Sequence, residues 1–118
     1  MTQKRTQAER RGRRGELLAA WYLRLTGWRI LGRRVRTPRG EIDIVARRGR
    51  TVAFVEVKWR ANAADLADAI DSRRLRRVVA AAEAVAPRFV RRGDDMRIDV
   101  ILVSPRRLPR RIANATLA

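Results

Sequence analysis

Two side chains that dominate enzyme chemistry are missing from this sequence. The 118 residues contain no Cys and no His. Their absence excludes a disulfide framework, thiolate or imidazole catalysis, and zinc sites built on these ligands. Any chemistry must therefore come from carboxylates, Lys, Arg, hydroxyl groups or a bound cation.

Acidic residues are scarce as well. The chain has 12 Asp plus Glu against 29 Lys plus Arg, which leaves a formal net charge of +17. Together with 46% hydrophobic residues, this balance describes a folded protein with a strongly basic surface. The expected partner of such a surface is a polyanion, and we favour nucleic acid over an anionic membrane.

Lysine is nearly absent. Lys4 and Lys58 are the only two, and the other 27 basic residues are Arg. Lys differs from Arg in carrying a compact charge whose pKa shifts on burial. Lys58 lies inside a predicted strand, so it is the position at which a Lys in place of an Arg indicates a specific chemical role.

Long apolar runs are also lacking. No stretch approaches the roughly 18 consecutive apolar residues of a membrane span. The run from Leu17 to Leu23 follows an Arg-rich start, as in a signal peptide, but Glu16 and Arg24 interrupt it and no small-residue cleavage pattern follows. We therefore expect a cytoplasmic protein without a membrane partner.

The length is that of a single domain. Residues 1–11 are polar and basic without an apolar period, which predicts a flexible arm. Residues 12–103 are expected to form the domain, with 62–71 as a connecting segment, and residues 104–118 a loose tail. Apolar periodicity and turn residues predict helices over about 12–26 and from Ser72 onward, and strands over 28–36, 41–46, 51–59 and 97–103.

The second and third strands are predicted to form the centre of the sheet. If residues 47–50 make a four-residue loop, Asp43 faces Phe54 and Glu41 faces Glu56, with paired positions summing to 97. Both faces of this hairpin are largely apolar, which predicts a sheet with helices on both sides. The alternation places Ile42 and Ile44 on one face, and the four polar residues Glu41, Asp43, Glu56 and Lys58 on the other.

Charges on an otherwise apolar face need compensation. The carboxylates of Asp43 and Glu56 lie close enough across the strand pair to converge on one ion. Mg²⁺ suits this arrangement, because it takes one or two protein carboxylates and completes its octahedron with water and phosphate oxygens. Such a metal activates a water for attack on a phosphodiester, while Lys58 orients that water or offsets charge on the phosphorus oxygens.

Plainer interpretations stand beside this one. Asp43 and Glu56 are also explained by strand-end ion pairs with Lys58 or an Arg, Glu41 by a solvated strand start, and Glu16 by helix electrostatics. For Asp99 we favour support of a neighbouring Arg over catalysis. The Arg residues of the second helix are explained equally by a solvated face or by phosphate binding. The candidate nucleic-acid contacts are Arg13, Arg34, Arg36, Arg39, Arg60, Arg73, Arg74 and Arg77.

Two motifs carry a family resemblance. Gly40-Glu41-Ile42-Asp43, followed by Phe54-Val55-Glu56-Val57-Lys58, resembles the bacterial YraN-type family within the PD-(D/E)XK nuclease superfamily, and the match extends over residues 12–103. The resemblance implies a restriction-endonuclease-like or Holliday-junction-resolvase-like α/β core: a central mixed sheet of about four strands flanked by helices (α/β/α). It further implies Asp43 and Glu56 as metal ligands, Lys58 as the catalytic Lys and Glu16 as an auxiliary carboxylate. Trp59 and Arg74 depart from the small hydroxyl residue and the Lys expected there.

We therefore expect a Mg²⁺- or Mn²⁺-dependent endonuclease that hydrolyses nucleic acid, DNA first and including branched or damaged structures. Its metal ligands are expected to be Asp43 and Glu56, with Glu16 and Glu41 as further candidates. The alternative is a non-catalytic nucleic-acid-binding protein that retains the nuclease fold. An apolar stripe on the first helix, Leu18, Trp21 and Leu25, also predicts a homodimer.

Overall fold

A computed structural model of the protein describes residues 2–61 and 72–114. The predicted connecting segment 62–71, residue 1 of the expected arm and residues 115–118 of the expected tail lie outside that range. The elements in chain order are α1 (Thr2–Leu25), β1 (Arg29–Thr37), β2 (Gly40–Arg48), β3 (Thr51–Trp59), α2 (Ser72–Phe89), β4 (Asp95–Val103) and β5 (Arg110–Ile112).

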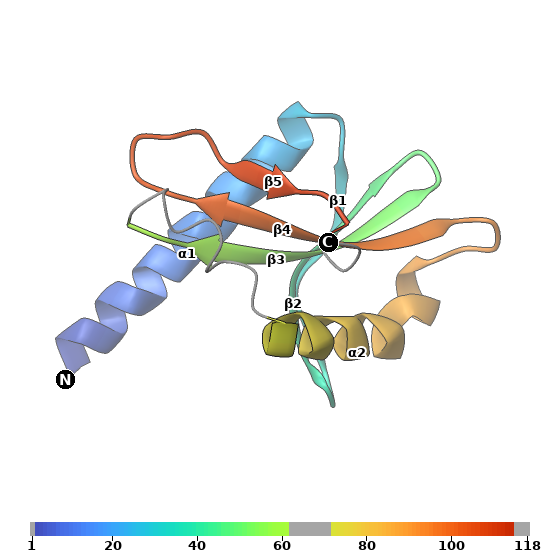
Figure 1. Ribbon diagram of the computed structural model, residues 1–118, viewed down its shortest axis with the longest axis horizontal. Coiled ribbons are helices and arrows are strands. Elements are labelled where there is room, and N and C mark those ends of the chain that lie inside the picture. Colours follow the sequence, from blue (N-terminus) through green and yellow to red (C-terminus); the bar gives the residue numbers. More distant parts are fainter. Residues whose placement is uncertain (1, 62–71, 115–118) are drawn as a thin grey trace.

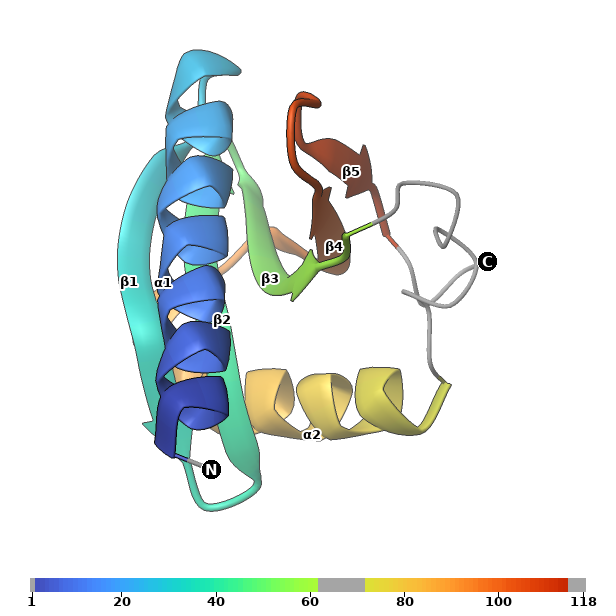
Figure 2. The same ribbon diagram turned by 90° about the vertical axis from the view of Figure 1, so that its left-hand side faces the viewer.

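The strands form one mixed sheet with a helix on each face (Figure 1). Neighbours follow the chain order β1-β2-β3-β4-β5, and only β3 and β4 are parallel among the described strands. The predicted mixed α/β sheet between helices is confirmed in this coarse form, with five strands instead of about four. The two helices run in different directions across the sheet (Figure 2).

Two apolar cores lie on opposite faces of the sheet, one beneath each helix. One contains Ala19, Ala20 and Leu23 of α1 packed on the sheet, and the other contains Val78 and Val85 of α2 on the opposite side. Alternate residues of β3 enter each core, so the middle of this strand is buried on both faces. Charged groups at its end, Glu56 and Lys58, are therefore drawn out of water with it.

The expected N-terminal arm is helical instead. α1 begins at Thr2 and continues without a break to Leu25. Residues 2–11 contain no Gly or Pro, and eight of the ten are Arg, Gln, Lys, Ala or Glu, which favour helix. Thr6, Gln7 and residues 9–11 are exposed, so polar composition here accompanies a solvated helix, as opposed to an unstructured arm. α1 ends before Gly27, whose φ is 93°.

The stripe formed by Leu18, Trp21 and Leu25 lies exposed on α1. A homodimer through these residues stays a prediction. Neither helix of the described ranges has the length and hydropathy needed to cross a membrane.

The expected C-terminal tail is partly ordered by a buried charge. β5 pairs with β4, and Asp99 of β4 is fully buried. Its carboxylate forms ion pairs with Arg97 at 3.2 Å and Arg111 at 3.4 Å, and it accepts a hydrogen bond from the Asn114 backbone N–H at 2.8 Å. The supporting role predicted for Asp99 is confirmed, and its partners include residues that the sequence pattern left in a loose tail.

The β2–β3 hairpin has a shorter loop than predicted. Arg48 pairs with Thr51, so Gly49 and Arg50 form a two-residue turn, and Gly49 has the positive φ (62°) that such turns favour. Paired positions therefore sum to 99, and Val45 lies opposite Phe54 where Asp43 was expected. A shift of two residues does not exchange the faces of a strand, and Asp43 and Glu56 line the same pocket.

β2 changes its path at Asp43. The paired register with β3 ends at Ile44 and Val55. Ile44 lies in the core beneath α1, whereas Ile42 packs with Val35 in the core beneath α2. The prediction that Ile42 and Ile44 share a face is therefore wrong, because β2 diverges from β3 between them.

Replacing Asp99 by Ala should lower the free energy of unfolding by about 2 to 3 kcal/mol, because it leaves two partly buried guanidinium groups without their carboxylate. Urea denaturation measures this loss. Glu83→Ala, which removes an exposed carboxylate of α2, is the control and should change stability by less than about 0.5 kcal/mol. Equal effects of the two substitutions would contradict the role given to Asp99.

Candidate functional site

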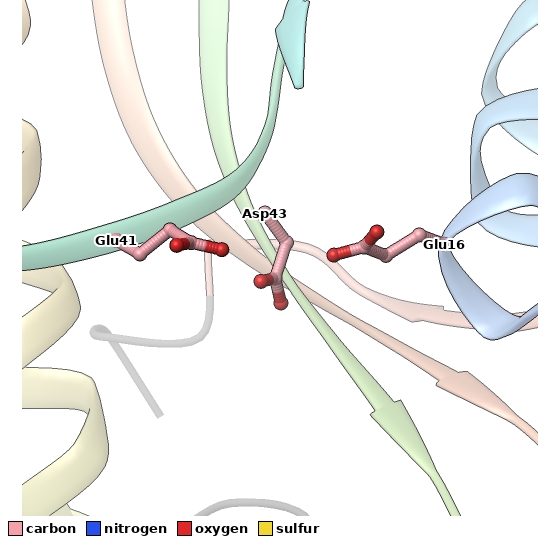
Figure 3. Close-up of side chains that lie close together, drawn as sticks. All are labelled: Glu16, Glu41 and Asp43. Atoms are coloured by element: carbon pink, nitrogen blue, oxygen red, sulfur yellow. The ribbon is translucent and has the colours of Figure 1, made fainter. Parts of the chain in front are cut away.

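Three carboxylates converge beside the point where β2 leaves β3. Glu41 and Asp43 come from β2 and Glu16 from α1, and the three side chains face one another (Figure 3). Each contributes an oxygen, and these oxygens lie within 4.8 Å of one another. Gly15, the residue before Glu16, lies close to Val57 and Trp59, so this part of α1 is next to the end of β3.

Asp43 is the centre of this group. Its Oδ2 accepts a hydrogen bond from the Val57 backbone N–H at 2.8 Å, beyond the last paired residues of the β2–β3 ladder. The side chain thus takes the place of a strand acceptor. Burial raises the pKa of Asp43 from 3.8 to about 6; the Val57 hydrogen bond opposes this shift, and the charges of neighbouring carboxylates, Glu56 first, add to it.

Glu56 and Lys58 lie at the end of β3, and their residues are 9% and 5% exposed. Lys58 Nζ is 3.0 Å from Glu56 Oε1, and the Arg74 Nε from α2 lies 3.0 Å from the same oxygen. Burial lowers the pKa of Lys58, opposed by Glu56 and assisted by Arg74 and Arg60. Lys58 Nζ is itself buried, and among the described residues its one close acidic partner is Glu56.

A pocket of about 520 Å³ lies between the acidic residues Glu41, Asp43 and Glu56 and the helix α2. Its acidic wall comes from the strands and its basic wall from the first two turns of α2. A second cleft of about 400 Å³ shares Arg73 and Arg77 with it. The pocket is lined by Gly40, Glu41, Asp43, Glu56, Arg73, Arg74, Arg77 and Val78, and the cleft by Arg39, Arg73, Arg76, Arg77 and Ala80.

Four of the eight predicted nucleic-acid contacts, Arg39, Arg73, Arg74 and Arg77, therefore gather at the pocket and cleft. Arg76 also lines the cleft. The sequence interpretation gave the arginines of this helix a share in phosphate binding but did not include Arg76 among the eight candidate contacts. Its signal was present, because Arg73, Arg76 and Arg77 have the three- and four-residue spacing of one helix face.

The other four predicted contacts lie elsewhere. Arg34 binds Glu16 at 2.7 Å, and Arg36 lies 3.7 Å from Glu41. Arg60 donates to the Trp59 carbonyl oxygen, and Arg13 is exposed on α1. Arg34 has a φ of 50°, a left-handed conformation that costs a non-glycine residue about 1 to 2 kcal/mol.

The donor set fits a hard divalent cation. Glu16, Glu41 and Asp43 offer only carboxylate oxygens, which Mg²⁺, Mn²⁺ and Ca²⁺ prefer. Two ligand oxygens on one Mg²⁺ are about 2.9 to 4.2 Å apart for bonds near 2.1 Å. Small side-chain rotations would bring the three carboxylate oxygens, now within 4.8 Å of one another, into this range. Glu56, predicted as a principal ligand, lies on the pocket wall outside this closest group and is ion-paired.

Asp43→Asn should stabilise the metal-free protein at neutral pH. Between pH 3.8 and about 6 the folded carboxyl is protonated while the unfolded one is ionised, so stability falls as pH rises through this window. Asn avoids that loss and still offers an acceptor to Val57. In EDTA at pH 8 we expect a gain of about 1 to 2 kcal/mol in urea denaturation, which disappears at pH 3.5. A pH-independent difference would contradict the buried ionisation.

Comparison with known proteins identifies relatives over most of the chain. The model of the uncharacterised protein family UPF0102 matches residues 15–103, which include every carboxylate of the site and Lys58. A UPF0102 protein of Sphingopyxis alaskensis is 67% identical over 110 residues, covering 93% of this chain and 95% of the relative. UPF0102 proteins of Rhizorhabdus wittichii and Erythrobacter litoralis are 61% and 62% identical and cover 94% and 95% of this chain, and 94% and 97% of their own lengths. The chain therefore belongs to the UPF0102 family.

Proposed function

We propose that this protein is a Mg²⁺- or Mn²⁺-dependent endonuclease of the PD-(D/E)XK type, with a restriction-endonuclease-like core, that hydrolyses phosphodiester bonds in DNA. The observation that carries the proposal is the pocket in which Glu41, Asp43 and Glu56 face the arginines of α2. A carboxylate wall suits a cation, and a guanidinium wall suits phosphates. A phosphodiester bound between them would meet both.

The carboxylates of Glu16, Glu41 and Asp43 would hold the metal, with Glu56 as the next nearest acid. A divalent ion bound there supplies Lewis-acid activation of the phosphodiester and a more acidic water. Asp43 is the residue most sensitive to the ion, because its carboxylate is drawn out of water without an ion pair among the described residues. The hydrogen bond from Val57 fixes its orientation.

Lys58 would act on the reacting phosphate. Its ammonium group is buried and held at 3.0 Å from Glu56, so its position is set before substrate arrives. A donor fixed in a site from which water is excluded stabilises charge that develops on phosphorus oxygens. The compact ammonium suits this place better than the planar guanidinium that the chain uses elsewhere.

The arginines would bind the phosphates on either side of the reacting one. The cleft of Arg39, Arg73, Arg76 and Arg77 continues the pocket, so a polyanion can extend from one into the other. The net charge of +17 adds a long-range attraction that salt weakens.

A second candidate function is nucleic-acid binding without cleavage. The observation that favours it is the engagement of Glu56, whose Oε1 already contacts both Lys58 and Arg74. A carboxylate used in this way can serve the fold alone. The two candidates differ in whether the site binds a divalent ion and whether the bound ion supports hydrolysis.

Mn²⁺ should stabilise the wild-type protein. At a concentration 100 times the dissociation constant, one site adds about 2.7 kcal/mol to the free energy of unfolding. Asp43→Asn should lose most of this increment, whereas Glu83→Gln, which alters an exposed acid of α2, should keep it. Urea denaturation with and without Mn²⁺ gives the comparison, and equal stabilisation of both variants would place the ion elsewhere.

Wild-type protein with Mg²⁺ or Mn²⁺ should cleave at least one member of a panel of linear, nicked, flapped and four-way DNA substrates. Asp43→Asn and Lys58→Met should each lower the rate by at least about 100-fold, because they remove a ligand and the fixed donor. Labelled substrates on denaturing gels measure the products.

Glu83→Gln purified in parallel is the control for a substitution outside the site and should retain the wild-type rate. Metal binding at Asp43 without cleavage of any substrate would overturn the endonuclease and support the binding protein. Cleavage unaffected by either site substitution would assign the activity to a contaminant.

A further inference from the structure

We propose that Arg74 is an exchangeable counterion, which neutralises Glu56 in the metal-free protein and moves to a nucleic-acid phosphate when a divalent ion binds the carboxylates. The inference rests on the proposed function. It adds that the metal and the nucleic acid bind cooperatively through one residue of α2.

The contacts of Glu56 distinguish a fixed cation from a movable one. Lys58 and Arg74 both lie 3.0 Å from the same carboxylate oxygen. The side chain of Lys58 is 5% exposed and enclosed by the sheet, whereas that of Arg74 is 61% exposed on α2. Only Arg74 can leave this oxygen without carrying a buried charge through the core.

A divalent ion would weaken the hold of Glu56 on Arg74. An ion among Glu16, Glu41 and Asp43 places two positive charges in the pocket that Arg74 also lines. Like charges in a partly desolvated pocket repel, and Glu56 is then shared between more cations than it can neutralise. The exposed guanidinium is the group that can respond by turning outward.

Phosphate is a matching second partner for the released group. The planar guanidinium binds carboxylate and phosphate with the same two-donor geometry, so the exchange keeps its hydrogen bonds. Arg73 and Arg77 line the same pocket and would bind neighbouring phosphates of the same strand. The Arg74 guanidinium would therefore exchange the Glu56 carboxylate for a phosphate of a nucleic acid bound in the same pocket.

The neighbouring acids are neutralised in a similar way. Glu16 is paired with Arg34, and Glu41 with Arg36. Both partners are more exposed than their acids, as Arg74 is relative to Glu56. The metal-free site thus carries its own counterions, and Arg74 is the one that also lines the pocket with Arg73 and Arg77.

Coupling of this kind is reciprocal. A divalent ion that releases Arg74 raises the affinity for nucleic acid, and nucleic acid that takes Arg74 raises the affinity for the ion. Removing Arg74 should therefore have opposite effects on the two ligands, which a purely structural residue would not show.

The first measurement is Mn²⁺ binding to full-length protein without nucleic acid, by isothermal titration calorimetry. Arg74→Ala is compared with Arg77→Ala, which removes the same charge from the same pocket but has no ion pair with a described acid. We expect Arg74→Ala to bind Mn²⁺ about threefold more tightly than Arg77→Ala, because of these two arginines only Arg74 is ion-paired with Glu56, whose charge it neutralises.

The second measurement is the affinity for a labelled DNA duplex with and without Mn²⁺, with the DNA checked as intact after each titration. Without Mn²⁺, Arg77→Ala should weaken binding more than Arg74→Ala, because Arg74 is still engaged with Glu56. The increase in affinity caused by Mn²⁺ should be about threefold smaller in Arg74→Ala than in wild type, and unchanged in Arg77→Ala.

The outcomes separate this inference from the function beneath it. If wild type binds Mn²⁺ but the two variants show equal metal affinity and equal coupling, the exchange is wrong while the metal site stands. If wild type binds no Mn²⁺, the metal site and the exchange both fail. Tighter Mn²⁺ binding in Arg74→Ala together with reduced coupling would support the exchange.

Discussion

The site depends on one hydrogen bond between a side chain and a strand. Where β2 diverges from β3, the Val57 N–H loses its strand partner, and the Asp43 carboxylate accepts from it instead. A partly buried amide without an acceptor would be costly, so the bond stabilises the divergence of the strands and orients the carboxylate. The opening gives Glu41 and Glu16 room to approach Asp43, and burial raises the pKa of Asp43 to about 6. Asp43 therefore supports the fold through its hydrogen bond, while ionisation of its carboxyl group lowers the free energy of unfolding.

Asp99 and Asp43 are both acidic groups drawn out of water, and they differ in what surrounds them. Asp99 is fully buried and has two guanidinium groups and a backbone N–H as partners, so it needs nothing further. Asp43 has one backbone donor and other carboxylates as neighbours. The charge of Asp99 is balanced by its partners, and these contacts hold β5 against β4. The charge of Asp43 is not balanced by a neighbouring cation in the described part of the chain and faces a pocket, which is the physical reason to expect a metal ion there.

The sequence predicts that Asp43 and Glu56 lie near each other better than it predicts the fold around them. Alternation placed Asp43, Glu56 and Lys58 on one side of the central strands, and the two-residue error in the loop did not matter because strand faces repeat every two residues. Ile42 was misplaced because the divergence from β3 depends on contacts outside β2 itself. The helix over residues 2–11 was missed because polar composition was interpreted as disorder. β5 was missed because it depends on a partner, Asp99, that lies 11 residues or more away in sequence.

The most direct test of this account is the pKa of Asp43, measured by NMR from its side-chain carboxyl carbon in full-length protein. Without divalent ions the account predicts a value of about 6, and with saturating Mg²⁺ it predicts a fall below the ordinary value of 3.8, because the ion favours the charged form. A pKa near 3.8 in the metal-free protein, or a raised pKa that Mg²⁺ leaves unchanged, would contradict it.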